Sequence, residues 1–287
     1  MRILVGHNYP DYQLLDSGNG MKLERFGIYT LSRPDPNALW KPRQAPSMWN
    51  NADAVFDPQK RFGKTHWNNK RVAEPWQFSH ESICLKLRLT PFKHTGLFPE
   101  HIENWKWFSS LIAREKQPPR VLNLFGYTGG ATLAAARAGA MVTHVDASRP
   151  SITWARENQA LSGLADASIR WIVDDAVSFT AREVRRASRY DAVIMDPPAF
   201  GRDPKGNVFT FERDVPRLLN LVKQILSPRP LFVLINSYSL GFSATTIANM
   251  LGDILPLSSI ECGELHLQEK DGKRTLPCSV FARYQAQ

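Results

Sequence analysis

The residues best suited to chemistry are Asp196-Pro197-Pro198, which follow a run of apolar residues. Proline lacks a backbone N–H, so two consecutive prolines remove two donors and stiffen the turn. The carboxylate and the nearby carbonyl oxygens then act only as acceptors, which suits an exocyclic amino group whose nitrogen lone pair must face an electrophile. Phe200 follows closely enough to stack a base extruded from its neighbours. Because the same tripeptide also forms plain turns, its place in the fold decides between a functional and a structural interpretation.

A second candidate site is the glycine-rich segment 126–130 together with Asp146, which lies 20 residues after Gly126. Such a turn lets the backbone approach a ligand, and an acidic residue at the end of the next strand accepts hydrogen bonds from a ribose diol. The spacing predicts a nucleotide-type cofactor, unless the glycines serve only tight turns. It does not by itself choose between a nicotinamide dinucleotide and S-adenosylmethionine.

The elements that must position these residues begin near residue 99, where strands and helices start to alternate. The expected strands are 121–125, 141–145, 168–173, 190–195 and 230–235. The expected helices are 102–112, 131–138, 150–161, one from about 177, one from about 214 with Pro216 in its first turn, and 243–254. This alternation predicts an α/β fold, a Rossmann-like doubly wound parallel sheet that binds its ligand at the carboxyl ends of the strands.

The C-terminal segment breaks the alternation, because 260–268 and 275–284 flank a turn at 270–273 and predict an antiparallel hairpin. A simple dinucleotide fold does not require such a hairpin, and the segment 126–130 is not G-x-G-x-x-G. Both features favour S-adenosylmethionine over a nicotinamide cofactor.

The N-terminal segment has a different character. Residues 11–18 and 21–31 predict two strands around a turn at Asn19-Gly20, and 82–90 alternate like a further strand, so we expect a small β-rich domain. Between them, phenylalanine and tryptophan alternate with basic residues, which is typical either of a nucleic-acid surface or of a solvated loop with its aromatic rings tucked inside. The residues are Lys60, Arg61, Phe62, Lys64, His66, Trp67, Lys70 and Arg71.

Bulk composition sets wider limits. The 287 residues carry a net charge of +9, which is compatible with a polyanionic partner but is also common among proteins that bind no nucleic acid. No stretch approaches the roughly 20 apolar residues that a membrane helix needs, and the start of the chain does not read as a signal peptide. Three cysteines, Cys84, Cys262 and Cys278, have no zinc-binding spacing, so we expect no metal and a reducing cytoplasm.

Three segments occur in the order of a known family: Lys-His-Thr-Gly-Leu-Phe at 93–98, Asn-Leu-Phe-Gly-Tyr-Thr-Gly-Gly at 123–130, and Asp-Pro-Pro-Ala-Phe at 196–200. From about residue 90 onward the chain resembles the class I S-adenosylmethionine-dependent methyltransferases. Within them it resembles the branch of bacterial large-subunit ribosomal RNA methyltransferases that modify cytosine C5 or guanine N2. The resemblance covers roughly two thirds of the chain.

The resemblance implies functional residues. Those expected at the transferred methyl are Asp196, Pro197, Pro198 and Phe200. Those expected to bind S-adenosylmethionine are Lys93, Thr95, Phe98, Asn123, Phe125, Gly126, Tyr127, Thr128, Gly129, Asp146, Ala147, Ser148, Asp175, Ala176 and Asp196. In this family Asp146 would bind the ribose, and Asp175 with Ala176 the adenine amino group.

One departure from the family narrows the chemistry. Cytosine-C5 enzymes of this branch carry a nucleophilic cysteine after the fifth strand, whereas this chain reads Ile-Asn-Ser-Tyr-Ser at 235–239 and places Tyr238 there. Without a thiolate the covalent C5 route is disfavoured. The expected acceptor is a nitrogen or oxygen, with guanine N2 favoured by the acceptor groups at Asp196.

We therefore expect residues 1–90 to form a β-rich substrate-recognition domain and 91–287 a methyltransferase domain that acts on ribosomal RNA. RNA-modifying members of the family often carry a small N-terminal RNA-binding domain, and this N-terminal segment shows no motif of that domain, so a protein or small-molecule amine remains an alternative substrate. Two other classes also stay open: a nicotinamide-dependent oxidoreductase, and an RNA-binding protein that has lost its chemistry.

Overall fold

The computed structural model describes residues 1–286 apart from 64, 203–205, 207, 239 and 240. It divides the chain into two compact units: a large unit of Met1–Leu4, His101–Leu265 and Ser279–Gln287, and a small unit of Val5–Glu100 and His266–Cys278. One division between the units falls between Glu100 and His101. The terminal hairpin also belongs to both units, because its turn packs with strands that lie more than 200 residues earlier in the chain.

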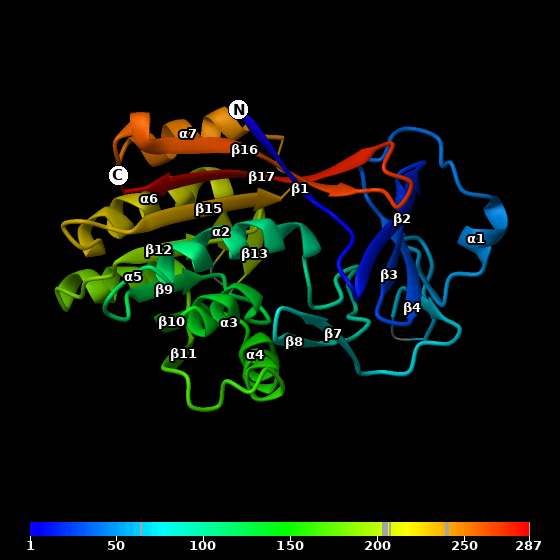
Figure 1. Ribbon diagram of the computed structural model, residues 1–287, viewed down its shortest axis with the longest axis horizontal. Helices are drawn as coiled ribbons and strands as arrows, with labels where there is room; N and C mark the ends of the chain where they lie inside the picture. The colour runs from blue at the N-terminus through cyan, green and yellow to red at the C-terminus, as the bar shows by residue number, and fades with distance from the viewer. Residues whose placement is uncertain (64, 203–205, 207, 239–240, 287) are drawn as a thin grey trace. The chain divides into compact units, whose positions relative to one another are not determined.

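The large unit is built on a sheet of eight strands in the order β1-β16-β17-β15-β12-β9-β10-β11 (Figure 1). The strands are β1 (Arg2–Gly6), β9 (Arg120–Leu124), β10 (Met141–Asp146), β11 (Ile169–Val173), β12 (Ala192–Met195), β15 (Phe232–Tyr238), β16 (Ile260–Gln268) and β17 (Thr275–Gln285). Five neighbouring strands, β11, β10, β9, β12 and β15, pair in parallel, and β17 pairs antiparallel to β15. The expected parallel sheet with a terminal antiparallel strand is confirmed.

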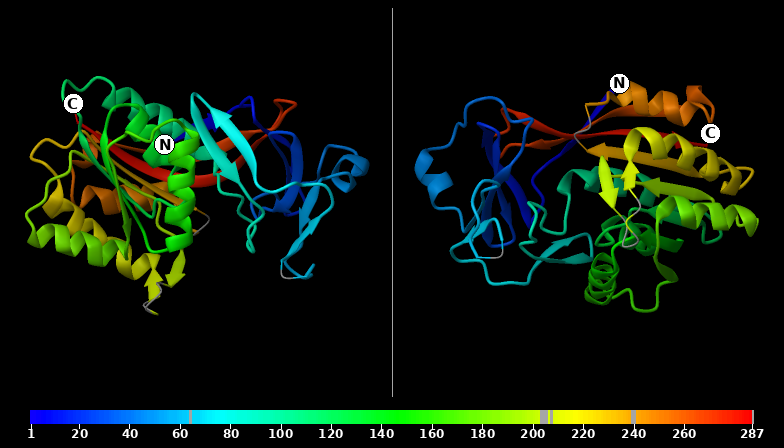
Figure 2. Two further views of the ribbon diagram at one scale, coloured as in Figure 1. Left: turned by 90° about the horizontal axis from the view of Figure 1, so that it is seen from below. Right: turned by 180° about the vertical axis from the view of Figure 1, so that it is seen from behind.

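Helices lie on both faces of this sheet (Figure 2). They are α2 (Ile102–Ile112), α3 (Gly130–Arg137), α4 (Arg149–Leu161), α5 (Ala176–Arg185), α6 (Phe211–Ile225) and α7 (Ala244–Gly252), with short 3-10 turns η1 (Pro99–His101) and η2 (Leu257–Ser259). Apolar side chains of α5, α6 and α7 form one cluster with the central strands, in which Val193, Leu218 and Ile247 are fully buried. Burial on both faces explains why β12 reads as a continuous apolar run.

Helix α6 differs from its sequence prediction. It begins at Phe211 instead of 214, so Pro216 lies inside the helix rather than in its first turn. Two contacts accompany the earlier start: the Phe211 side chain is buried in the core, and the Asp214 carboxylate accepts a hydrogen bond from Thr210 N, four residues earlier, at 2.8 Å. We infer that these contacts outweigh the helical hydrogen bond that Pro216 cannot donate.

The small unit contains a five-stranded sheet in the order β2-β3-β4-β5-β6 and a separate pair, β7-β8. The strands are β2 (Tyr12–Gly18), β3 (Met21–Phe26), β4 (Tyr29–Pro34), β5 (Ala54–Phe56), β6 (Trp67–Asn69), β7 (Trp76–His80) and β8 (Ile83–Leu87), and a short helix α1 (Pro46–Asn50) precedes β5. The stretch 21–31, predicted as one strand, is two, because Gly27 turns the chain in a left-handed conformation (φ 59°).

The core of the small unit holds ionised side chains. Arg33 on β4 binds Glu24 on β3 through two nitrogens, at 2.5 and 3.0 Å, and Lys22 lies 3.2 Å from Asp35. Tyr12 donates to Glu24 at 2.8 Å. All five side chains are buried. We call this set, Tyr12, Lys22, Glu24, Arg33 and Asp35, the buried ion cluster.

Candidate functional site

The turn after β9 has an unusual backbone. Phe125 and Tyr127 both adopt positive φ, at 59° and 49°, and Gly129 follows at 88°. Residues other than glycine rarely adopt positive φ. Those that do are concentrated at functional sites, because the surrounding structure must hold the backbone in this strained conformation. The turn is therefore shaped for more than joining β9 to α3.

Gly126 is required by close packing. A Cβ at this position would lie 2.3 Å from His144 Cε1, so no larger residue fits without moving the imidazole. His144 is fully buried on β10, where its Nδ1 lies 2.8 Å from Thr132 Oγ1. Burial lowers the pKa of His144 to about 3, which keeps the ring neutral beneath the turn.

Asp146 joins the turn after β9 to the turn after β10. One carboxylate oxygen accepts from Tyr127 N at 2.8 Å, and the other accepts from Ser148 N at 2.8 Å. Burial raises the pKa of Asp146, and these two backbone hydrogen bonds oppose the rise. Each carboxylate oxygen can accept a further hydrogen bond, so the group can also bind a ligand hydroxyl.

Asp196 lies on the other side of the same turn. Strand β9 pairs in parallel with both β10 and β12, and Leu124 is in register with Val145 on one side and Met195 on the other. The next residues along the three strands are Asp146, Phe125 and Asp196. The sheet therefore brings both predicted carboxylates to the two flanks of the strained turn, which sequence spacing alone could not establish.

The residues after Asp196 form a surface element. Pro197 is buried and Pro198 exposed, and β13 (Phe200–Arg202) pairs with β14 (Val208–Thr210) in a short antiparallel hairpin. The Phe200 side chain is 59% exposed, so its ring is available for stacking. Phe209 on β14 instead packs against Phe125, with ring centroids 5.2 Å apart, and links the hairpin to the turn after β9.

His101 is a neighbour of Asp196 to which the sequence assigned no role. Its Nδ1 lies 3.6 Å from Asp196 Oδ2. The two residues are 95 positions apart, and only the packing of α2 on the sheet brings them together. The one sequence signal was its position directly after the 93–98 segment.

Several predicted cofactor residues have structural partners. Asn123 is buried and donates to Thr132 Oγ1 at 2.8 Å, Thr128 O accepts from Asn158 Nδ2 at 2.9 Å, and the Ser148 side chain caps α4. Asp175 caps α5 through one carboxylate oxygen, which accepts from Ser178 N at 2.7 Å.

The remaining predicted cofactor residues near these turns are small. Ala147 follows Asp146 directly, and Ala176 packs in the core of the large unit. Their side chains offer no polar group, so any contact with a cofactor would use their main chains.

Lys93, Thr95 and Phe98 belong to the small unit. Lys93 O accepts from Arg33 Nη1 at 3.0 Å, so the buried ion cluster holds this segment. The Thr95 hydroxyl is fully buried and has no hydrogen-bond partner among the described residues, which is a costly state for a polar group in the absence of a ligand or water.

The basic and aromatic residues at 60–71 separate into two groups. Trp67 is 1% exposed, and its indole donates to Thr90 O at 2.8 Å, so it is a core residue and not a stacking surface. Lys60, Arg61 and Lys70 are exposed, whereas Lys64 lies outside the described residues.

No cysteine stands at the end of β15. Tyr238 is its last residue, and Ser239 lies outside the described residues. Cys278 is fully buried, and burial raises the pKa of its thiol, which disfavours the thiolate that a nucleophile needs. Cys84 and Cys262 lie on β8 and β16.

No helix in the described part of the chain is long and apolar enough to cross a membrane. Within the same residues, no group of three or more His, Cys, Asp or Glu side chains is arranged to hold a metal ion.

The chain is similar in sequence to known proteins. A family model described as S-adenosylmethionine-dependent methyltransferase matches residues 50–251. The chain is 35% identical over 214 residues to the ribosomal RNA large subunit methyltransferase K/L of Shewanella oneidensis, across 70% of this chain and 29% of that protein. The same enzyme of Shewanella baltica is 31% identical over 205 residues, across 67% and 28%. The chain thus spans less than a third of the length of these relatives.

Among solved structures, an S-adenosylmethionine-dependent methyltransferase from Agrobacterium tumefaciens superimposes with a TM-score of 0.93 at 40% identity, covering 100% of this chain and 94% of that one. A chain from Streptococcus mutans, at TM-score 0.72 and 17% identity, covers 96% of this chain and 75% of that one. The second likeness shows the fold alone.

Proposed function

Because this chain belongs to the family of S-adenosylmethionine-dependent methyltransferases, we propose that it methylates an exocyclic amino nitrogen of a base in RNA, with guanine N2 of ribosomal RNA as the preferred acceptor. The family match also decides the choice of cofactor in favour of S-adenosylmethionine over a nicotinamide dinucleotide. The position of Asp146 and Asp196 on opposite flanks of one strained turn carries the proposal, because it puts a ribose acceptor beside an amino-group acceptor.

The described residues fit S-adenosylmethionine. Asp146 offers lone pairs to a ribose diol, and the turn 125–129 lets the main chain approach the ligand closely. Asp175 keeps one carboxylate oxygen beyond its helix cap for an adenine amino group. When bound, the cofactor supplies an electrophilic methyl group on a sulfonium.

The residues around Asp196 would hold the acceptor. Its carboxylate and the adjoining main-chain carbonyls accept the amino hydrogens, which turns the nitrogen lone pair toward the methyl group. The nitrogen loses a proton after the new C–N bond forms, and Asp196 is placed to accept it. Exposed Phe200 would stack the extruded base from one side.

Three observations support RNA as the substrate class. The two Shewanella relatives are named as ribosomal RNA methyltransferases, the net charge is +9, and exposed Lys60, Arg61 and Lys70 lie together in the small unit's sequence. Cations of this kind bind phosphates by releasing condensed counterions. We assign the small unit a role in substrate recognition on this basis.

The first experiment follows transfer of a labelled methyl group from S-adenosylmethionine to undermodified ribosomal RNA, with the products digested and identified as nucleosides. Labelled N2-methylguanosine is the expected product. Labelled 5-methylcytidine would contradict the amino-nitrogen assignment. Transfer only to protein or to small amines would replace RNA as the substrate class and keep the enzyme class.

Two variants separate the roles of the carboxylates. Asp146→Ala is expected to weaken binding of S-adenosylmethionine in calorimetry, because it removes the ribose acceptor and frees Tyr127 N. Asp196→Ala is expected to abolish transfer while binding stays close to the wild-type value. An active Asp196→Ala enzyme would remove the acceptor site from the proposal.

A further inference from the structure

We propose that His101 is a positioning residue that aims the Asp196 carboxylate at the acceptor, an inference that rests on the function proposed above. The contact that carries it joins His101 Nδ1 to Asp196 Oδ2 at 3.6 Å. Both side chains are largely shielded, with 11% of His101 and 29% of Asp196 exposed. A donor held beside a partly buried carboxylate restricts the directions in which its oxygens can point.

The main chain and the side chain of Asp196 are held by different parts of the structure. The buried strand β12 and the following prolines fix the main chain at this point. The carboxylate can still rotate about its own side-chain bonds, which have several staggered minima. A donor near Oδ2 would favour the minima in which that oxygen faces His101.

Helix α2 holds His101 rigidly. Three residues after His101, Asn104 is fully buried, donates to Asn236 Oδ1 on β15 at 2.9 Å and accepts from Arg283 Nη1 on β17 at 3.0 Å. The ring of Phe108 stacks on Phe232 of β15, with centroids 5.8 Å apart. The start of the helix is therefore tied to two strands of the same sheet that carries Asp196.

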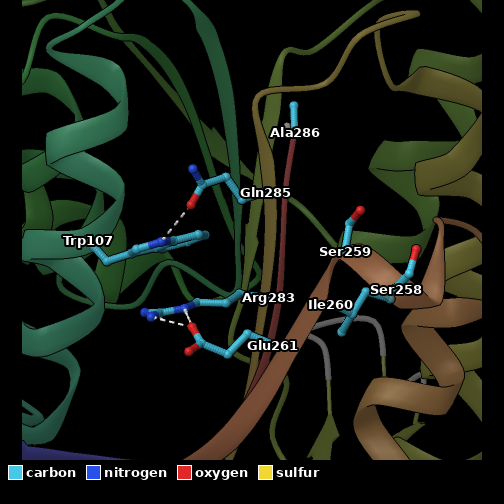
Figure 3. Close-up of a pocket in the computed structure, with 8 residues that line it drawn as sticks. All are labelled: Trp107, Ser258, Ser259, Ile260, Glu261, Arg283, Gln285 and Ala286. Atoms are coloured by element: carbon cyan, nitrogen blue, oxygen red, sulfur yellow. Dashed lines mark hydrogen bonds and ion pairs between the residues drawn. The ribbon is translucent and has the colours of Figure 1, made fainter.

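A second set of contacts anchors the middle of α2 (Figure 3). The Arg283 guanidinium lies 4.4 Å from the Trp107 ring centroid, and Glu261 on β16 holds it at 2.7 Å from Nε. The Trp107 indole donates to Gln285 Oε1 at 3.3 Å. These contacts fix the backbone of α2 along most of its length, so the gap between His101 and Asp196 can close by small rotations of the two side chains.

The gap of 3.6 Å is a few tenths of an ångström beyond a hydrogen bond, and contacts of this kind commonly shorten when substrate is bound. Donation from Nδ1–H requires no charge on the ring. A side-chain amide at position 101 can supply an equivalent donor, whereas a methyl group cannot. A variant with an amide at position 101 therefore distinguishes two roles of His101: positioning of Asp196 by a hydrogen bond, and transfer of a proton by the imidazole.

The test compares His101→Ala and His101→Asn with wild type in methyl transfer to RNA, with Lys106→Ala as a control that removes an exposed ion pair on the same helix. Asparagine is the matched variant because its amide nitrogen is attached to Cγ, as Nδ1 is in histidine. We expect His101→Ala to lower kcat roughly tenfold to 100-fold, as misdirected reacting groups do, with KM and cofactor affinity unchanged. His101→Asn and Lys106→Ala should retain most of kcat. An asparagine variant as slow as the alanine variant, or an alanine variant as fast as wild type, would overturn the proposal.

Crystal structures of the same variants test the proposal without turnover. Positioning predicts one Asp196 rotamer in wild type and His101→Asn, and two or more in His101→Ala. One shared rotamer in all three would overturn the proposal even in an active enzyme. If wild type methylates no RNA but the rotamers diverge as expected, the proposed substrate fails and the role of His101 stands.

Discussion

The interiors of the two units differ in one respect: the small unit buries a connected set of ionised side chains among its apolar residues. The large unit packs apolar residues of α5, α6 and α7 against a parallel sheet. The small unit buries ionised Lys22, Glu24 and Arg33 among its strands. Both units also bury many apolar side chains, so the buried ion cluster is added to a hydrophobic core and does not replace it.

This difference predicts how the stability of each unit should respond to substitutions in its interior. Apolar burial is non-directional and roughly proportional to area, so an apolar core loses stability gradually as side chains are trimmed. A buried ion cluster adds little net stability compared with apolar residues of the same size. Loss of one charged partner nevertheless leaves the other charges buried without an opposite charge, which is strongly destabilising. Burial alone would raise the pKa of Glu24, but Arg33 and Lys22 outweigh it and hold that pKa at about 2.

The largest expected effect is that of Glu24→Ala. It leaves Arg33 and Lys22 buried without their shared carboxylate, and should lower the free energy of unfolding by about 3–5 kcal/mol. Hydrogen exchange of β3 and β4 amides measures the loss within the small unit. Asp57→Asn, which removes a largely exposed pair with Lys60, is the control and should cost no more than about 1 kcal/mol. A comparable cost for both variants would contradict the comparison.

Leu218→Ala probes the apolar core of the large unit. The side chain is fully buried, so its truncation should cost about 2–5 kcal/mol, with the lower values if α6 relaxes into the cavity. Faster hydrogen exchange of the β9 and β12 amides measures this loss of stability. Leu257→Ala, at a side chain that is 55% exposed, should change stability by less than about 0.5 kcal/mol. A negligible effect at Leu218 would show that this core is not close-packed.

The stability of the two units should depend on pH through different titratable groups. The pKa of His144 is lowered by burial from 6.5 to about 3, so below pH 6.5 the unfolded chain binds a proton that the folded chain excludes. Stability of the large unit should therefore fall as the pH drops from 6.5 toward 3, by about 2 kcal/mol at pH 5 from this one group. Glu24, whose pKa is lowered from 4.5 to about 2, maintains its contribution until the pH drops below 4.5.

Denaturant titrations of wild type and His144→Gln between pH 7 and pH 5 test this assignment. The variant should be less stable at neutral pH, because it disturbs packing beneath Gly126, but its pH dependence should be flatter. Parallel curves for the two proteins would assign the acid sensitivity to other groups.

The smallest expected effect concerns Asp175, which caps α5 and is also a predicted adenine contact. Asp175→Ala should cost about 1 kcal/mol through loss of the cap, whereas Asp175→Ser retains a capping oxygen and should cost less. If Asp175 also binds the cofactor, both variants should weaken binding of S-adenosylmethionine in calorimetry. Normal affinity in the serine variant would limit Asp175 to its helix cap.

Much of the large unit was predictable, because its signals are local. Alternating apolar runs and capped helices gave the parallel sheet, and Gly126, Asp146 and Asp196 follow strands as expected. Short β-strands carry weaker signals, so the sequence predicts no strand at β5, β6 or β7 and a single strand over 21–31, where the structure has two. Trp67 was ambiguous for the same reason, since its burial depends on strands and loops elsewhere in the small unit.

The sequence by itself determined the α/β class, the terminal hairpin, the family resemblance and the absence of a cysteine after β15, because each depends on residues that are near one another in the chain. Only the tertiary structure decided that β1 joins β16, that His101 lies beside Asp196, and that the hairpin turn belongs to the small unit. These pairings join residues far apart in sequence, and their energy comes from packing and hydrogen bonds that form only when the whole chain has folded.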